Sequence, residues 1–409
     1  MGIPDRRDWR TPAVTLAAGA VLLAISLGIR HAFGLFLAPM SQAHGWTREV
    51  FAFAIALQNL AWGVAQPFAG RIADRYGAGR VIVGGALLYV AGLVLMAFAS
   101  TGMLLALSAG LLIGIGLSGV SISVVFGAVL RRTPPGRRSF AMGVAMSVGS
   151  LGQFVMLPAA LTAIQSVGWM ATLLSLAVLG VAMFPLAAPL AEPPGAGASR
   201  PPPMPLRAVL GEALSLPGFW LLCLGFFVCG FHVVFIATHL PAYLTDRGLP
   251  ASTGAVVLAL VGLFNIAGTY TAGVLGGRRS KPALLVALYV LRALVLTAFV
   301  LVPLTEGSAY AFGAAMGLLW LSTVPLTNGT VATVFGVENL ALLGGIVFFF
   351  HQVGAFLGGW LGGRLYVLTG SYDAVWWMSV ALAVVAALLN VPVREVPVAR
   401  LRARAEDAA

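Results

Sequence analysis

Arginine and histidine side chains inside long apolar segments are the residues of this sequence with the clearest chemical meaning. Arg30 and His31 stand within S-L-G-I-R-H-A-F-G-L-F. A guanidinium in an apolar medium costs at least about 2.5–3.5 kcal/mol unless it faces a cavity or a partner. None of the 13 acidic residues falls in the middle of an apolar segment. We therefore infer that Arg30 binds an anionic ligand through its fork of donors, with His31 beside it. The alternative is that Arg30 extends toward the nearer end of its segment.

Three more histidines, His232, His239 and His351, lie in apolar segments of the second half of the chain. Histidine titrates near neutral pH, so each is a candidate carrier of a coupled proton. His232 and His239 are two helical turns apart and lie on roughly one helix face, which makes both candidates for substrate contact as well. The alternative for each histidine is a neutral imidazole that is bonded to a backbone carbonyl.

Other polar residues in apolar segments extend the candidate site without defining a reaction. We expect Asn265, Trp320 and Asn328 to contact substrate, and Asn59, Gln66 and Ser121 are further polar candidates on the cavity side. Helix packing is the alternative for each. Arg292 is expected to have a structural, hydrogen-bonding role instead. The sequence has no H-E-x-x-H motif, no Walker loop and no Ser-His-Asp order in its apolar segments. It therefore predicts no enzyme, no cofactor and no metal site.

The composition requires lipid as the solvent of these segments. Of 409 residues, 60% are hydrophobic and 9% are charged, whereas a soluble domain carries about 25% charged residues. With about 20 apolar residues for each spanning helix and short loops, this length predicts about twelve spans. The first apolar run is long and lacks a cleavage site of small residues, so we interpret it as a spanning helix rather than a removed signal peptide.

Apolar runs of spanning length recur in two groups of six. The first group lies in residues 1–190 and the second in residues 217–393. The Pro/Gly-rich segment 191–216 is expected to be a cytoplasmic linker, and 394–409 a basic tail. We therefore predict an all-α membrane protein of twelve transmembrane helices in two pseudo-symmetric six-helix bundles. The expected helices are 12–39, 47–70, 81–99, 102–130, 139–164, 168–190, 217–244, 251–276, 282–303, 307–334, 339–368 and 371–391.

The basic residues predict the orientation of these helices. With the amino terminus inside the cell, nineteen of the 24 Lys and Arg residues fall in cytoplasmic segments and three fall outside. This excess follows the positive-inside rule and accounts for the net charge of +11 without a nucleic-acid partner. We expect both termini in the cytoplasm of a bacterial-type inner (plasma) membrane, with membrane lipids around a monomer.

The loop after the second expected helix carries a motif that points to a family. Residues 70–80, G-R-I-A-D-R-Y-G-A-G-R, closely resemble the loop motif G-x-[LI]-A-D-R-x-G-x-R-[RK] of the major facilitator superfamily. The corresponding loop of the second half, G-V-L-G-G-R-R-S-K at 273–281, keeps the glycine and the basic run but not the acid. This internal repeat supports the prediction of two related halves.

The motif residues are candidates for a gate. Gly70 is expected to let two helices approach closely. Asp74 is expected to cap a neighbouring helix end or to pair with an arginine, for which Arg131 is the candidate. The alternative is a charged turn that only orients the helices. The remaining gating candidates are Arg75, Gly77 and Arg80.

Within the superfamily, the whole chain looks like the branch of monocarboxylate porters and oxalate/formate antiporters. The similar segments are R-H-A-F-G-L-F-L-A-P-M (30–40), G-W-T-R-E-V (45–50), H-Q-V-G-A-F-L-G-G-W-L-G-G (from 351) and T-G-S-Y-D (369–373). The resemblance implies a cavity lined by the first, fourth, seventh and tenth helices. It also implies that a basic residue of the first helix, here Arg30, handles substrate or proton. Where members of the branch carry an arginine in the eighth helix, this chain has Asn265 and Thr269.

These observations predict a secondary active transporter of a small organic anion, a mono- or dicarboxylate, that is coupled to protons and works by alternating access. Its partners are then the anion and the proton. The alternative is an exporter of amphipathic or drug-like compounds, whose cavity would be lined by aromatic residues such as Trp62, Phe231 and Trp320. A non-transporting sensor is disfavoured, because the tails and the linker are short.

Overall fold

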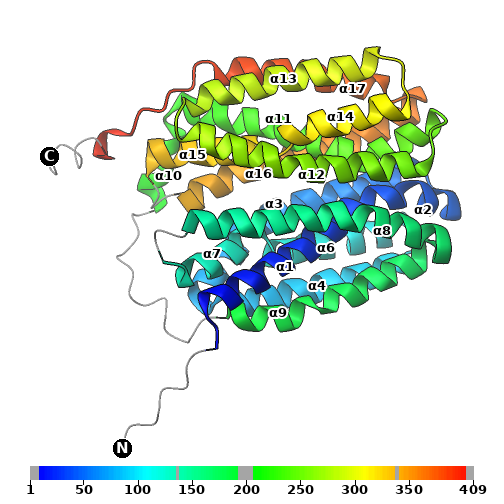
Figure 1. Ribbon diagram of the computed structural model, residues 1–409, viewed down its shortest axis with the longest axis horizontal. Helices are drawn as coiled ribbons and strands as arrows, with labels where there is room; N and C mark the ends of the chain where they lie inside the picture. The colour runs from blue at the N-terminus through cyan, green and yellow to red at the C-terminus, as the bar shows by residue number, and fades with distance from the viewer. Residues whose placement is uncertain (1–8, 135–137, 192–205, 337–339, 402–409) are drawn as a thin grey trace, which may run out of the picture.

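All regular secondary structure in the described residues is helical. A computed structural model describes residues 9–134, 138–191, 206–336 and 340–401 (Figure 1). Eleven helical segments are long and apolar enough to cross a membrane. The longest, Gly143–Leu190, is interrupted at Gly168, whose φ of +83° suits glycine and is unfavourable for other residues. Division at Gly168 gives twelve crossings, which confirms the predicted architecture.

The first half contains six crossings, and the first and fourth of them are irregular. The first is broken by the 3-10 turn η1 (Phe33–Phe36), two residues after His31. The fourth contains a π-helical stretch, η2 (Ala106–Leu112), and is interrupted a second time after α6, which ends at Gly119. The other elements of this half are α1 (Pro12–Ala32), α2 (Leu37–His44), α3 (Arg48–Tyr76), α4 (Ala78–Ala97), α5 (Gly102–Leu105), α6 (Ile113–Gly119), α7 (Ile122–Arg132), α8 (Arg138–Val181) and α9 (Met183–Leu190).

The second half also contains six crossings. It is preceded by a short helix, α10 (Leu206–Leu214), which lies inside the segment expected as a linker. Residues 192–205 of that segment lie outside the described residues. The tenth crossing is broken at residues 320–322. The other helices are α11 (Pro217–Asp246), α12 (Ala251–Gly276), α13 (Lys281–Leu301), α14 (Glu306–Leu319), α15 (Thr323–Phe335), α16 (Leu340–Thr369) and α17 (Asp373–Asn390).

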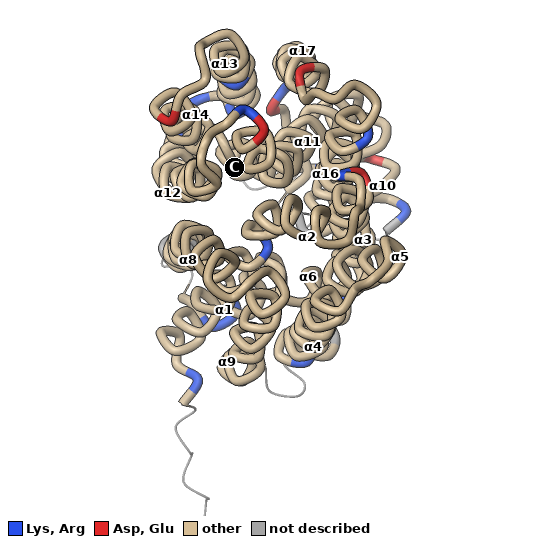
Figure 2. The backbone as a smooth tube through the Cα atoms, turned by 90° about the vertical axis from the view of Figure 1, so that its right-hand side faces the viewer, with Lys and Arg blue, Asp and Glu red and all other residues tan. Residues whose placement is uncertain are grey.

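The two sets of helices form two layers, with α1, α4, α8 and α9 in one and α11 to α15 and α17 in the other (Figure 1). The same division is visible along the helices, where α3 and α16 lie side by side at the boundary (Figure 2). The start of α1, α10 and the described chain after α17 lie at one end of the bundle, which we call the terminal face. The other end, where α3 begins and α11 ends, we call the opposite face.

α3 and α16 form one of the two long contacts between the halves. They run close together from the opposite face to Gly63, where an added methyl group would lie 2.6 Å from the Cβ of Gln352. Seven residues further in the same register stand Gly70 and Gly345. Of the described atoms, none lies within 4 Å of a methyl group added at either position. The two helices therefore separate toward the terminal face.

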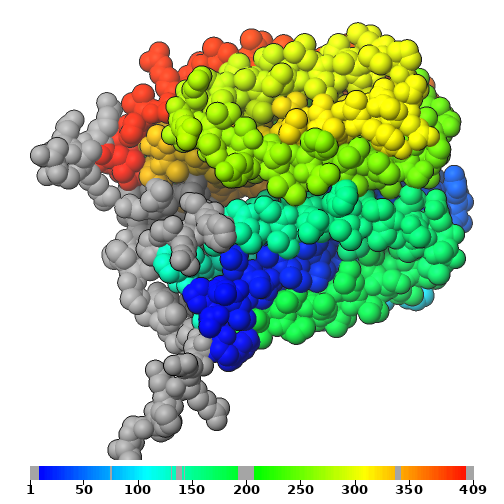
Figure 3. All heavy atoms as spheres, viewed as in Figure 1, coloured from blue at the N-terminus to red at the C-terminus, as the bar shows by residue number. Residues whose placement is uncertain are grey.

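α8 and α12 form the other long contact and behave in the same way. Their atoms meet along the boundary between the layers (Figure 3). A methyl group added at Gly262 would lie 3.3 Å from the Cβ of Gln153, whereas nothing described lies within 4 Å of one at Gly143 or Gly273, about three turns closer to the terminal face. The close approach predicted at Gly70 is thus not found in this conformation, because the halves are separated at that end.

Candidate substrate site and gate

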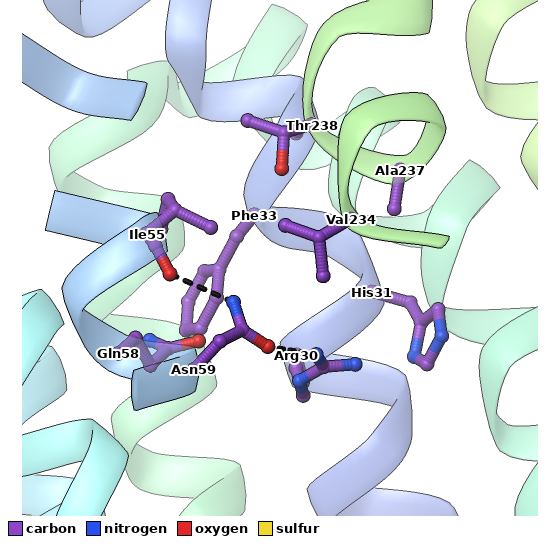
Figure 4. Close-up of a pocket in the computed structure, with 10 residues that line it drawn as sticks. Arg30, His31, Phe33, Ile55, Gln58, Asn59, Val234, Ala237 and Thr238 are labelled. Carbon is purple, nitrogen blue, oxygen red and sulfur yellow. Dashed lines mark hydrogen bonds between the residues drawn. The ribbon is translucent and has the colours of Figure 1, made fainter. Parts of the chain in front are cut away.

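The guanidinium of Arg30 points into the interior of the protein from the last turns of α1 (Figure 4). Its Nη2 donates a hydrogen bond of 2.6 Å to Asn59 Oδ1 on α3, and its central carbon lies 4.9 Å from the centre of the Trp62 ring. The amide nitrogen of Asn59 donates to the carbonyl of Ile55 at 2.8 Å, which keeps the amide oxygen turned toward Arg30. This placement argues against the alternative in which Arg30 extends to the membrane surface.

The positive charge of Arg30 has no carboxylate partner in the part of the chain that the structure describes. Its hydrogen-bond partner is a neutral amide, and its Nε is buried without a partner. The face of the Trp62 ring stabilises a cation by about 0.5–2 kcal/mol. That contribution is smaller than the cost of leaving a charge in an apolar environment, so the site favours an anionic ligand.

Arg30 lines a small cavity between the halves (Figure 4). The cavity has a volume of about 20 Å³, roughly the space of one water molecule. A larger ligand therefore requires the walls to move. The first half supplies the charge and the amides, while the second half contributes a mostly apolar wall. The lining residues are Arg30, His31, Phe33, Gly34, Ile55, Gln58, Asn59, Val234, Ala237 and Thr238.

Two of these residues, His31 at the end of α1 and Gly34 in η1, make different kinds of contact at the cavity. The Nδ1 of His31 lies 2.8 Å from the carbonyl oxygen of Leu27, which is the backbone-bonded alternative stated above for the histidines. Gly34, in η1, lies directly against the backbone carbonyl of Ala237 on α11, where a side chain of any kind would collide. The break in the first crossing thus brings the halves into contact just beyond Arg30.

A row of polar side chains on α3 extends the site toward the terminal face. Trp62 Nε1 donates to Gln66 Oε1 at 2.8 Å, and Gln66 Nε2 donates to Ser121 Oγ at 2.9 Å. Asn59, Trp62 and Gln66 follow the i, i+3, i+7 spacing of one helix face. That spacing is the sequence signal for this row. The sequence predicted Asn59, Gln66 and Ser121 as polar candidates on the cavity side, and Trp62 as a lining residue of the alternative exporter.

The two histidines of α11 face away from the cavity. The cavity face of α11 is formed by Val234, Ala237 and Thr238. His232 Nε2 lies 2.9 Å from the carbonyl oxygen of Ser379 on α17, and His239 faces α16 and the residue before α17. Both side chains are fully buried. The structure therefore does not bring them together with Arg30, because they lie on the face of α11 that packs against α16 and α17, while a different face lines the cavity.

The remaining histidine, His351, also lies apart from the cavity on α16. Its Nδ1 is 3.1 Å from Gln352 Oε1, and its ring packs between those of Phe226 and Phe348 with centroid distances of 4.7 and 5.8 Å. Only 6% of its surface is exposed. Its role as a proton carrier remains a prediction.

Asn265 and Arg292 both support the break in the tenth crossing. Asn265 Oδ1 accepts a hydrogen bond of 3.0 Å from the backbone nitrogen of Leu321. Arg292 is fully buried, and its Nη2 donates to the carbonyl oxygens of Leu319 and Trp320 at 2.6 and 2.5 Å. Backbone groups that a helix break leaves unpaired must find partners. The contacts of Arg292 therefore agree with the structural, hydrogen-bonding role that was expected for it.

Trp320 and Asn328 do not line the cavity beside Arg30. The Trp320 side chain is fully buried, and its indole nitrogen has no partner among the described residues. Asn328 donates through Nδ2 to the carbonyl of Val324, one turn earlier in α15, at 3.0 Å. Substrate contact by either residue remains a prediction.

A gate of charged residues joins the halves at the opposite face. Arg48, at the start of α3, binds both carboxylate oxygens of Asp246, at the end of α11, at 2.5 Å each. Glu49 pairs with Arg364 of α16 at 3.2 Å. The side chains of Arg48 and Asp246 are 18% and 31% exposed. These four residues, which we call the opposite-face gate, were recognised in the sequence only as loop charges, because their partners lie 198 and 315 residues away.

Tyr372, the residue before α17, connects this gate to the buried His239. The Nη1 of Arg48 lies 3.2 Å from the hydroxyl oxygen of Tyr372, and that hydroxyl lies 3.1 Å from His239 Nδ1. Burial raises the pKa of Tyr372 to about 12, although Arg48 acts in the opposite direction. The hydroxyl therefore keeps its proton at neutral pH and donates it in a hydrogen bond.

The loop-motif residues lie at the terminal face. The side chains of Asp74 and Arg75 lie outside the described residues. Gly77 has a φ of +94° and separates α3 from α4, so this position requires glycine. Arg80 is exposed in the first turn of α4, and Arg131 is half-buried in the last turn of α7. Their gating role remains a prediction.

The chain after α17 crosses the terminal face of the second half. Glu395 binds both the backbone nitrogen and the Nζ of Lys281, at 2.8 and 2.7 Å, and Arg400 binds Glu212 of α10 at 3.1 Å. A cavity of about 410 Å³ lies between this segment, the start of α11 and the end of α15. Its lining is mainly apolar and includes none of the predicted site residues, so it does not enlarge the candidate site.

The comparison with protein families agrees with this architecture. Residues 16–336 match the profile of the Major Facilitator Superfamily. The chain belongs to this superfamily. It is therefore a multi-pass membrane protein and a secondary transporter, and not an enzyme, as the sequence predicted. In the described residues, no group of three His, Cys, Asp or Glu side chains is arranged to hold a metal ion.

Individual relatives are similar over most of their length. Human monocarboxylate transporter 11 is 28% identical over 384 residues, which cover 90% of this chain and 80% of that protein. The uncharacterized MFS-type transporter YcxA of Bacillus subtilis is 25% identical, with 90% of both chains covered. The MFS-type transporter YhjX of Escherichia coli, also uncharacterized, is 23% identical over 85% of this chain and 86% of its own. The predicted resemblance to monocarboxylate transporters is thereby confirmed as a distant relationship.

Proposed function

We propose that this protein transports a small organic anion, a mono- or dicarboxylate, together with a proton across the inner membrane of a bacterial-type cell. The observation that carries the proposal is the Arg30 site, where a guanidinium is held by a neutral amide and lacks a carboxylate among the described residues. A carboxylate that enters the cavity would supply the missing charge and accept two parallel hydrogen bonds.

The name of the human relative, monocarboxylate transporter 11, is consistent with this substrate class. The eighth crossing, however, carries Asn265 with Thr269 at 3.1 Å instead of an arginine. Arg30 is therefore the cationic group that we assign to the substrate carboxylate. His31 lines the same cavity and would contact the uncharged part of the ligand.

The separation of the halves suggests the direction in which this conformation is open. The terminal face carries the start of α1 and α10, and the excess of basic residues in its loops supports a cytoplasmic position for this face. With the opposite-face gate closed and the helices apart at Gly70 and Gly345, the conformation faces inward. Rocking of the two halves about the Arg30 site would then give alternating access. We propose that the monomer is the transporting unit.

Substitution of Asn59 provides a sharp test of anion recognition. Asn59→Asp places a carboxylate where Arg30 already has a hydrogen-bond acceptor at 2.6 Å. The new ion pair satisfies Arg30 internally and competes with the substrate. A charge-assisted hydrogen bond contributes about 1.5–3 kcal/mol, so we expect a roughly 10- to 150-fold loss of uptake efficiency. Arg30→Ala should lose uptake to a similar extent because it removes the cation.

The assay is uptake of radiolabelled lactate, pyruvate and oxalate into proteoliposomes with an imposed pH gradient. Asn59→Gln is the matched control, because it keeps a neutral amide and leaves Arg30 without a carboxylate. Uptake by Asn59→Asp or Arg30→Ala at the rate of the parent protein would refute the site. Absence of uptake of every carboxylate by the parent would refute the substrate class.

An exporter of amphipathic compounds is the second candidate, and one observation favours it. The second-half wall of the cavity is apolar apart from Thr238, and Trp62 covers the guanidinium from the other side. Such a surface binds the hydrophobic part of an amphipathic anion. Resistance to apolar toxic compounds on expression, combined with no carboxylate uptake in proteoliposomes, would select this function.

A further inference from the structure

We propose that His239 is the proton-binding site of the opposite-face gate and that Tyr372 transmits its protonation to the ion pair between Arg48 and Asp246. This inference rests on the proton coupling proposed above and assigns the proton to a particular ring nitrogen. It also separates the two ligands in space, with the anion beside Arg30 on α1 and the proton beside the end of α11.

The hydrogen bonds of His239 determine which of its nitrogens is free to gain a proton. Nε2 lies 2.7 Å from the carbonyl oxygen of Gly359, which can only accept, so Nε2 carries the hydrogen. In a neutral imidazole Nδ1 is then the acceptor, and the Tyr372 hydroxyl donates to it at 3.1 Å. The oxygen of that hydroxyl accepts from Arg48 Nη1 at 3.2 Å. Every donor in this chain of contacts has an acceptor.

Protonation of Nδ1 would reverse the direction of one hydrogen bond. The imidazolium has two donors, so Nδ1 must donate to the Tyr372 oxygen and the hydroxyl hydrogen must turn elsewhere. The histidine also becomes a cation two hydrogen bonds away from the guanidinium of Arg48. Like charges at this range repel, and the buried imidazolium has no carboxylate beside it in the described residues. Both effects weaken the closed gate.

Opening of the gate relieves this repulsion. When the halves separate at the opposite face, Arg48 leaves with the first half, while His239 and Tyr372 stay in the second. Water can then solvate the imidazolium, which is fully buried in the closed state. A proton from the outer medium therefore favours the outward-facing conformation.

The other ionisable groups around the opposite face include one more histidine, His44 at the end of α2, whose ring stacks on that of Trp46 at 4.3 Å and has no hydrogen bond or ion pair to the gate residues in the described part of the chain. Arg247 and Asp373 pair with each other at 3.0 Å and are 49% and 58% exposed. The ring of Tyr366 stacks on the guanidinium of Arg48 at 4.2 Å. The groups near His239, taken from every element that packs around it, are Arg48 and Glu49 of α3, Tyr243, Asp246 and Arg247 of α11, Arg364 and Tyr366 of α16, and Tyr372 with Asp373 of α17.

The two remaining histidines of the second half lack such a connection. The Nε2 of His232 is bonded to the carbonyl of Ser379, and its Nδ1 has no partner among the described residues. His351 is bonded to Gln352 in the same helix. Neither contacts a residue of the opposite-face gate in the described part of the chain, so neither offers a path from protonation to gate opening.

Labelling of a cysteine beneath the gate tests the proposal without a transported substrate. Thr238 lines the cavity and is 3% exposed with the gate closed. In a protein with Cys223→Ser and Cys229→Ser, a Thr238→Cys thiol should react with a membrane-impermeant maleimide only when the gate opens. Rates measured at several outer pH values are divided by those of Ala251→Cys, an exposed position at the same face, to remove the intrinsic effect of pH on the thiol.

We expect the normalised rate to rise on acidification, by up to about tenfold for each pH unit if one proton is linked to opening. His239→Gln and Tyr372→Phe should both abolish this dependence, and Tyr372→Phe does so with the imidazole still present. Arg247→Gln, which removes an exposed charge of the same face, should keep it. Thermal unfolding of each purified variant confirms that the native state is retained.

Three outcomes would overturn the proposal: no pH dependence in the parent protein, unchanged dependence in His239→Gln, or unchanged dependence in Tyr372→Phe. Failure of the proposed function gives a different pattern. If labelling depends on pH through His239 but no carboxylate is taken up, the gate assignment stands and the substrate class is wrong. If carboxylate uptake is driven by a pH gradient but labelling does not depend on pH, the proton binds elsewhere.

Discussion

Asp246→Asn should move this protein from the inward-facing toward the outward-facing conformation. The substitution keeps the shape of the side chain but removes the charge that holds Arg48 with two contacts of 2.5 Å. A hydrogen bond to a charged group contributes about 1.5–3 kcal/mol when buried. Because Arg48 and Asp246 are 18% and 31% exposed, solvent screening reduces this to about 1–2 kcal/mol. The ratio of the two conformations should therefore change by roughly 5- to 30-fold.

The separated ends of the helices at the terminal face give a direct measure of this shift. Gly70 and Gly345 occupy matching positions on α3 and α16, and nothing described lies within 4 Å of a methyl group at either. When the terminal face closes, we expect the two positions to approach each other. Cysteines at both positions, in a background without Cys223 and Cys229, should then form a disulfide, which requires Cα atoms about 4.4–6.8 Å apart.

The rate of disulfide formation under a mild oxidant is the quantity to compare. Asp246→Asn should raise it by the factor given above, and a second pair, Gly143→Cys with Gly273→Cys, should respond in parallel because it lies at the same end of α8 and α12. Asp373→Asn is the control, since its ion pair with Arg247 is exposed and lies within one half. Equal rates in Asp246→Asn and the parent protein would show that the ion pair between Arg48 and Asp246 does not stabilise the inward-facing conformation.

Two predictions concern stability. Arg292→Met should lower the thermal unfolding temperature of the purified protein, because the carbonyls of Leu319 and Trp320 lose their buried donor; loss of such a partner costs about 1–3 kcal/mol for each unsatisfied group. An unfolding temperature equal to that of the parent protein would contradict the structural role of Arg292. Glu395→Gln should release the chain after α17 from Lys281 and increase its cleavage by protease, with a smaller effect of about 0.5–1 kcal/mol on unfolding because the pair is near the surface. Unchanged cleavage would show that this segment is held by its other contacts.

The sequence predicted the architecture because membrane spans follow from apolar length alone. Twelve crossings, two halves and the family all depend on local signals, namely runs of about 20 apolar residues and the loop motif at 70–80. The site was predicted only in part. Arg30 could be found because a charge in an apolar run is conspicuous. Asn59 was one of several polar candidates on the cavity side, but its pairing with Arg30 was not predicted, because the two residues are 29 positions apart and lie on different helices.

The rotation of α11 could not be predicted from the histidine pattern. His232 and His239 lie on one helix face, as their spacing requires, but that face packs against α16 and α17. Which face of a buried helix meets the cavity depends on its neighbours, and α11 is apolar all round, so its sequence contains no signal for the choice. The opposite-face gate was missed for a related reason, since four loop charges can pair in several ways until the fold fixes their positions.

Three arginines inside or at the edge of the membrane segments show why the charge of Arg30 is the one available to a ligand. Arg48 binds a carboxylate, so its charge is neutralised within the protein. Arg292 is fully buried, donates to two carbonyl oxygens and does not line the cavity beside Arg30. Arg30 lines a cavity and contacts a neutral amide and an aromatic face. An anion bound there would gain a cation that the fold has positioned but not neutralised. This difference between Arg30 and the other two arginines supports the proposal of an anionic substrate.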